Sequence, residues 1–159
     1  MTVPGEILTP FNIAQTILKF RIGFAGELDV QLAIEEILRR ACIPHQREFI
    51  LTRADRLDFL VDARQAAPAQ CAACAGLCSG KTGAGESCPC PCHPRNASGI
   101  AIEVKVKGQV AEVLRQLRRY AKHERITGLV LVTTRRLHAA SMPSEMNGKP
   151  LAVAMIGGL

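Results

Sequence analysis

The chain has 159 residues, of which 48% are hydrophobic and 21% charged, a composition typical of one globular domain with a single core. Its formal net charge is +6, which favours association with polyanions such as nucleic acid. No apolar stretch reaches the ~20 residues of a membrane span. Residues 1–6 lack the basic start and apolar run of a secretory signal, so we expect a cytoplasmic protein with no membrane partner.

Two helices and a hairpin are predicted in the first part of the chain. Residues 8–21 are largely apolar and form the first helix. Apolar side chains then recur at helical spacing over residues 27–41, with charged side chains on the opposite face. Two strand-like runs, residues 47–51 and 56–61, flank a polar turn at 52–55 and so predict a β-hairpin.

Residues 64–98 interrupt this pattern. They are rich in Ala, Gly, Pro and Cys and have almost no large apolar side chains, so we interpret them as an insertion within a single domain of residues 1–159. The remaining elements are a strand (99–106), a helix (109–124), an apolar strand (129–134), a loop (139–150) and a last strand (151–156). The order αββ(insert)βαββ predicts an α/β or α+β sandwich.

Charged side chains inside apolar strands carry the main functional signal. Period two places Glu103 and Lys105 on one face of their strand, and pairing with the neighbouring strand brings Asp58 within reach. Two carboxylates are oxygen ligands suited to Mg²⁺, which activates water and stabilises charge on a phosphate. Lys105 can orient the water or offset phosphate charge, and it needs a lowered pKa to act as a base. The alternative is a surface aspartate beside a Glu–Lys ion pair.

Two further positions add to this signal. Glu27 shares the apolar face of its helix, where an unpaired charge is costly, so it has either a metal-linked role or that of a first-turn acid favoured by the helix dipole. Gln116 and Tyr120 are four residues apart and share a helix face. The alternative for this pair is a solvated glutamine and a half-buried tyrosine. Asp55 is interpreted as a turn or surface residue, and Cys42 as a small buried one.

Basic side chains concentrate on the helix that carries Gln116. They are candidate contacts to DNA phosphates, or else solvated residues of a helix surface. With no Trp and one Tyr the chain is poorly equipped for base stacking, so backbone contacts are expected to dominate. The candidate DNA-binding residues are Arg115, Arg118, Arg119 and Lys122.

These residues, in this order, resemble the PD-(D/E)xK nuclease superfamily: Glu27, Asp58, Glu103-Val104-Lys105, Gln116 and Tyr120. The Gln-x-x-x-Tyr element is similar to the RecB-like and viral exonuclease branch, and the compact size is similar to archaeal-type Holliday junction resolvases. The resemblance spans residues 27–134 without the insertion. Leu57 occupies the position of the proline that names the motif.

The resemblance implies a restriction-endonuclease-like mixed sheet flanked by helices and a Mg²⁺- or Mn²⁺-dependent deoxyribonuclease of DNA repair or recombination. Asp58 and Glu103 would bind the metal, Lys105 would serve the nucleophilic water, and the acid at position 27 would support the metal. The Gln-x-x-x-Tyr pair would contact the site or DNA. Candidate partners are DNA, a second copy of the chain, and replication or recombination proteins. The alternatives are a non-catalytic nucleic-acid-binding protein that keeps the fold, and a nuclease directed at RNA.

The insertion carries most of the cysteines, and in a reducing cytoplasm such crowding indicates metal binding rather than disulfides. Two clusters separated by a Gly-rich turn can form a tetrahedral Zn²⁺ site. An iron–sulfur cluster and a segment that binds no metal are the alternatives. Because the insertion links the two acid-bearing strands, we expect it near the active edge, in contact with DNA. The candidate zinc ligands, four of which would be used, are Cys71, Cys74, Cys88, Cys90, Cys92 and His93.

Overall fold

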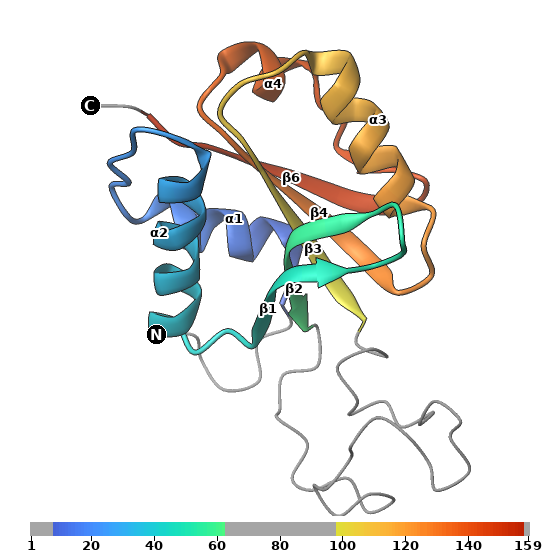
Figure 1. Ribbon diagram of the computed structural model, residues 1–159, viewed down its shortest axis with the longest axis horizontal. Coiled ribbons are helices and arrows are strands. Elements are labelled where there is room, and N and C mark those ends of the chain that lie inside the picture. Colours follow the sequence, from blue (N-terminus) through green and yellow to red (C-terminus); the bar gives the residue numbers. More distant parts are fainter. Residues whose placement is uncertain (1–7, 63–97, 158–159) are drawn as a thin grey trace, which may run out of the picture.

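The computed structural model describes residues 8–62 and 98–157. Within them, six strands form one mixed sheet flanked by helices, which is an α/β architecture (Figure 1). The elements in chain order are α1 (Pro10–Leu18), α2 (Glu27–Arg40), β1 (His45–Ile50), β2 (Arg56–Asp62), β3 (Gly99–Lys105), α3 (Val110–Ala121), β4 (Ile126–Thr133), α4 (Arg136–Ser141), β5 (Glu145–Met146) and β6 (Lys149–Met155). No helix in these two ranges has the length and apolar character needed to cross a bilayer.

The predicted helices, hairpin and strands are confirmed to within a few residues, but the prediction of a loop over 139–150 is wrong. Helix α4 reaches Ser141, and β5 pairs with β6 as a short antiparallel hairpin. Asn147 and Gly148 form its turn with φ angles of 52° and 72°. Two consecutive positive φ angles are typical of the tight turns that an Asn-Gly pair favours. This dipeptide was the available sequence signal for the hairpin.

The sheet has the strand order β1-β2-β3-β4-β6-β5. Strands β1, β2 and β3 pair antiparallel, whereas β3, β4 and β6 run parallel to one another. The parallel strands therefore end at the same edge of the sheet, where Lys105, Thr133 and Met155 lie in one row of the register. In open α/β sheets, ligands bind beyond the carboxyl ends of such strands.

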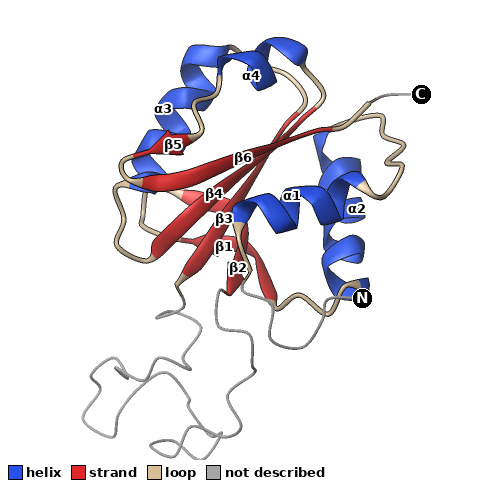
Figure 2. Ribbon diagram, turned by 180° about the vertical axis from the view of Figure 1, so that it is seen from behind, coloured by secondary structure: helices blue, strands red, loops and turns tan. Residues whose placement is uncertain are grey.

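The sheet is covered on both faces, by α1 and α2 on one side and by α3 and α4 on the other (Figure 2). The position of β4 inside the sheet explains why its sequence is continuously apolar. Val130 and Val132 pack in the cluster under α1 and α2, while Leu129 and Leu131 pack in the cluster under α3. A strand buried on both faces has no polar side to alternate with.

Gly128 is placed where α1 crosses β4. A Cβ atom at this position would lie 2.5 Å from Cγ of Pro10, so the close approach of the helix requires a glycine. The turn after α2 also differs from expectation, because Cys42 is exposed rather than buried. It adopts a φ of 54°, and the following Ile43 N–H donates to the Leu38 carbonyl. This is the left-handed position of a Schellman cap, which turns the side chain at position 42 towards solvent.

Candidate active site

Strands β2 and β3 separate at Asp58. Their ladder pairs Phe59 with Ile102 and stops there, and the next free N–H of β3, at Val104, donates to Asp58 Oδ2 at 2.7 Å. The Asp58 carboxylate thus takes the place of a backbone acceptor. Leu57 packs in the cluster under α3 and Phe59 in the cluster under α1 and α2, although residues two apart in a regular strand share a face. The alternation of side chains between the two faces of the sheet therefore shifts by one residue at Asp58.

Strand β1 is irregular at the same level. Glu48 lies between the residues of β1 that pair with Phe59 and Leu57, and it has a φ of 54°. A left-handed conformation is uncommon and strained for a residue other than glycine. Both strands of the hairpin are thus distorted at the position of Asp58. The consequence is that this carboxylate points into the gap between β2 and β3 instead of onto one face of the sheet.

Asp58 has a second partner that sequence reasoning missed. Gln31 Nε2 on α2 donates to Asp58 Oδ1 at 2.8 Å, and Gln31 is buried. Burial raises the pKa of the Asp58 carboxyl above its ordinary value, against the opposing effects of the Val104 N–H and the Lys105 ammonium. The available sequence signal was the position of Gln31 one helical turn after Glu27, on the same side of α2.

Glu103 is the most buried acid of the site, with 2% of its side chain exposed. Its Oε1 lies 2.6 Å from Lys105 Nζ and accepts a hydrogen bond of 2.6 Å from Gln116 Nε2. Burial, followed by the negative charge of Asp58, raises the pKa of Glu103 to about 7, even though Lys105 acts in the opposite direction. Two carboxylates are therefore held close together with one lysine beside them.

Gln116 and Tyr120 of α3 both reach this carboxylate. Tyr120 Oη lies 3.2 Å from Glu103 Oε2 and 2.9 Å from the Arg56 carbonyl, and its single hydrogen can serve only one of them. Gln116 Nε2 also donates to Tyr120 Oη at 2.5 Å. Burial and the Glu103 charge raise the pKa of Tyr120, so the phenol stays protonated. The i,i+4 pair thus clamps Glu103 from the α3 side.

Glu27 contacts the residues at the carboxyl end of β3. Its Oε1 lies 3.6 Å from Lys105 Nζ, and the Val106 N–H donates to its Oε2 at 3.4 Å. Burial lowers the pKa of Lys105, but the charges of Glu103, Glu27 and Asp58 outweigh it and the net shift is upwards. Lys105 is therefore cationic, which suits charge stabilisation and hydrogen bonding rather than the role of a base.

A second layer of polar residues supports the end of β3, and sequence reasoning missed its contribution. Thr133 Oγ1 donates to the Lys105 carbonyl at 2.8 Å. His138 is fully buried, with one ring nitrogen 3.1 Å from Thr133 Oγ1 and the other 3.1 Å from the Gly108 carbonyl. An isolated histidine in the sequence carries no signal for such a contact, because α4 brings it back to the sheet from outside the motif.

The four basic candidates on α3 are exposed, and one of them is already paired. Arg119 Nε lies 2.8 Å from Asp55 Oδ1. Asp55 lies in the predicted turn, which confirms the first of its two interpretations, and it is 7% exposed rather than a surface residue. The ion pair with Arg119 compensates its burial and fixes the hairpin turn against α3. The remaining three basic side chains, Arg115, Arg118 and Lys122, lie along one side of the helix.

The two strand carboxylates fit a hard divalent cation in chemistry, because they are oxygen donors with lone pairs left beside their present hydrogen bonds. No group of three or more His, Cys, Asp or Glu side chains among the described residues is arranged to hold a metal ion. The rest of a shell around Asp58 and Glu103 would therefore be backbone carbonyl, water and substrate oxygens.

The candidate zinc ligands of the insertion lie outside the described residues, and the zinc site stays a prediction from the sequence. The strand residues on either side of the insertion are described. Asp62 and Gly99 pair at the amino end of β3, four residues and about 13 Å along the strand from Glu103. Because β2 and β3 are antiparallel, the insertion joins the sheet at the end of the pair opposite to the acids, and its expected place near the active edge stays a prediction.

Comparison of the chain with models of known protein families, with curated proteins and with solved structures found no match. What can be said of function therefore depends on the site itself. Lys105 contacts Glu103 and Glu27, Gln116 and Tyr120 contact Glu103, and Asp58 accepts from the Val104 N–H between Glu103 and Lys105, so this cluster lies at the carboxyl end of β3.

Proposed function

We propose that this protein is a Mg²⁺-dependent deoxyribonuclease of the PD-(D/E)xK type. The observation that carries the proposal is the convergence of Asp58 and Glu103, from two different strands, beside the cationic Lys105. The β2–β3 ladder ends immediately before these acids, and their carboxylates are partly or fully buried. A sheet that served only as scaffold would gain stability from apolar side chains at these positions.

The proposed chemistry needs a cation that the two carboxylates hold. When bound, Mg²⁺ acidifies a water molecule and offsets charge that develops on the phosphate. Asp58 and Glu103 supply oxygen ligands, and their hydrogen bonds from Gln31, Val104 and Gln116 fix the orientation of those oxygens.

Lys105 has a separate task in this proposal. Its ammonium is held between Glu103 and Glu27, and its raised pKa keeps it charged at neutral pH. A fixed positive charge at the mouth of the site stabilises an incoming phosphate and donates a hydrogen bond to a phosphate oxygen or to the attacking water. Glu27 acts through Lys105 and the Val106 N–H, so it is a positioning residue.

An assay of the purified chain tests the proposal. Plasmid, linear duplex, branched DNA and RNA are incubated with Mg²⁺, Mn²⁺ or EDTA. We expect cleavage of at least one DNA with Mg²⁺ or Mn²⁺ and none with EDTA. DNA binding without cleavage under every condition would favour the non-catalytic alternative, and cleavage of RNA alone would assign the site to RNA. A preparation of Asp58→Asn protein made in parallel controls for a contaminating nuclease.

Helix α3 is the part of the proposed DNA-binding surface closest to the site. It carries Gln116 and Tyr120 on its inner side, and the exposed Arg115, Arg118 and Lys122 on its outer side. Phosphate contacts release counterions, so each contact adds about 0.9 to the slope of log affinity against log salt concentration.

Joint replacement of Arg118 and Lys122 by alanine is therefore expected to lower the salt slope of duplex binding by about 2, one contact for each side chain. Fluorescence anisotropy titrations at four salt concentrations measure this slope. The matched control replaces Arg39 and Arg40 at the end of α2, which removes the same charge from residues paired with Glu36. An equal effect of both double variants would show that net charge alone attracts DNA, without a binding face on α3.

A further inference from the structure

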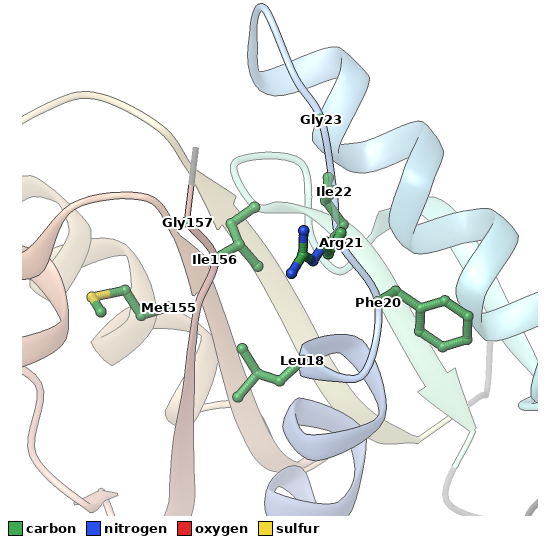
Figure 3. Close-up of a pocket in the computed structure, with 8 residues that line it drawn as sticks. All are labelled: Leu18, Phe20, Arg21, Ile22, Gly23, Met155, Ile156 and Gly157. Atoms are coloured by element: carbon green, nitrogen blue, oxygen red, sulfur yellow. The ribbon is translucent and has the colours of Figure 1, made fainter. Parts of the chain in front are cut away.

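An open pocket lies between the segment that follows α1 and the end of β6 (Figure 3). Its volume is about 510 Å³, within the ~300–1,000 Å³ typical of small-ligand sites. It is separate from the cluster of acids and from the basic side of α3. The residues that line it include Leu18, Arg21, Ile22 and Ile156, whereas Figure 3 shows the Met155 and Phe20 side chains directed away from the Arg21 guanidinium.

Arg21 is the charged side chain of this pocket. Figure 3 shows its guanidinium directed into the space towards Ile156, and no hydrogen bond or ion pair within the described part of the chain engages it. The other walls are apolar, and Leu18 is 41% exposed. An occupant must therefore combine an anionic group for the guanidinium with a flat or apolar group for the walls. A nucleotide has both, since arginine binds phosphate with a fork of two N–H groups.

The pocket lies at the same edge of the sheet as the candidate active site. Met155 at the end of β6 is in register with Thr133, and Thr133 is in register with Lys105. Neighbouring strands lie about 4.8 Å apart, so β6 runs roughly 10 Å from β3. The segment that begins at Phe20 also leads directly into Glu27, whose carboxylate meets Lys105. A DNA strand held by Lys105 can reach the pocket within a few nucleotides, since its axial rise is about 3.4 Å per nucleotide.

We infer that this pocket binds one unpaired nucleotide of the DNA substrate, with the phosphate on Arg21 and the base against the aliphatic walls. The inference rests on the proposed function for the identity of the substrate. In a continuous duplex each base is stacked and paired, and extracting it costs a few kcal/mol. A flap, an overhang or a branch point offers a base that is already free. The pocket therefore favours DNA with an unpaired nucleotide close to the scissile phosphate.

The test compares binding to two DNAs that differ only in one unpaired nucleotide, with EDTA present to prevent cleavage. We expect the wild-type protein to bind the DNA with the unpaired nucleotide more tightly. Arg21→Ala and Leu18→Glu should each reduce this preference at least about fivefold, as expected when one base contact is lost, with affinity for the plain duplex nearly unchanged. Both positions are exposed, so neither change should affect folding.

Two neighbouring variants serve as matched controls. Lys19→Ala removes an exposed positive charge from the same segment, and Phe11→Glu adds a negative charge to exposed apolar surface at the other end of α1. Neither residue lines the pocket, so both variants should keep the preference. An unchanged preference in Arg21→Ala and Leu18→Glu, equal losses on both DNAs, or a wild-type protein without any preference would each overturn the inference. Because binding is measured without cleavage, these outcomes are independent of whether the chain proves to be a nuclease.

Discussion

Replacing Asp58 by asparagine is expected to lower the metal-dependent cleavage rate about a thousandfold. The change removes one of the two charged ligands proposed for the metal, and a loss of about 4 kcal/mol in transition-state stabilisation corresponds to three decades in rate. Asparagine has the shape of aspartate, and its oxygen can still accept from the Val104 N–H. Its amide can donate to the Gln31 oxygen once that side chain rotates, so the fold should be preserved. Single-turnover cleavage with saturating enzyme and Mg²⁺ measures the effect.

The control for this experiment is Glu35→Gln. Glu35 is a partly exposed acid of α2 that pairs with Arg47 at 3.1 Å, outside the cluster around Lys105. It should cleave DNA at nearly the wild-type rate. A variant at Asp58 that still cleaved within about tenfold of wild type, with a normal unfolding midpoint, would remove this carboxylate from the metal site.

Replacing Glu103 by glutamine is expected to stabilise the metal-free protein above pH 7 while it destroys activity. In the folded chain the pKa of Glu103 is about 7, above its ordinary value of 4.5. The folded state therefore keeps a proton that the unfolded state releases, and the wild-type protein loses stability as pH rises from about 4.5 to about 7. At 1.36 kcal/mol per pKa unit this loss is roughly 3 kcal/mol, and it persists at higher pH. Glutamine is neutral at every pH and avoids it.

Thermal unfolding in EDTA from pH 5 to pH 8 measures this difference. The midpoint of Glu103→Gln should exceed that of wild type by about 5 to 10 °C at pH 8, and the two should converge at pH 5. Mg²⁺ at pH 8 should raise the wild-type midpoint more than that of the variant, because a ligand stabilises only the state that binds it. A variant less stable than wild type at pH 8 would mean that the ion pair with Lys105 outweighs the cost of burying the carboxylate.

The sequence predicted the meeting of Asp58, Glu103 and Lys105 for a reason that was only partly right. Alternation correctly placed Glu103 and Lys105 together on β3. The same argument treats Asp58 as part of a regular strand. In the structure the alternation of side chains between the two sheet faces shifts by one residue at Asp58, beside the strained Glu48. Strand distortion depends on how β1 and α2 pack against β2, and local sequence does not encode that packing directly. The acids meet because the ladder ends there.

The residues that the sequence missed share a physical feature. Gln31 and His138 act through contacts across 27 and 30 residues of chain, to Asp58 and to Gly108, which no local periodicity reveals. The burial of Asp55 likewise depends on Arg119, 64 residues away. By contrast, the β5–β6 hairpin has a local signal in Asn147-Gly148, a pair that favours tight turns. Local patterns give the elements of this fold, while the polar network around the acids follows from tertiary packing.

Asp62 and Gly99 are cross-strand partners, so the chain leaves the sheet and returns to it at a single point. The entropic cost of closing a loop rises only slowly with its length, so a junction of this kind tolerates connections of very different lengths at little cost in stability. Evolution can lengthen, shorten or exchange the cysteine-bearing stretch without moving the carboxylates at the other end of the two strands. The cluster of acids around Lys105 and the cysteine-bearing stretch are in this sense free to diversify independently.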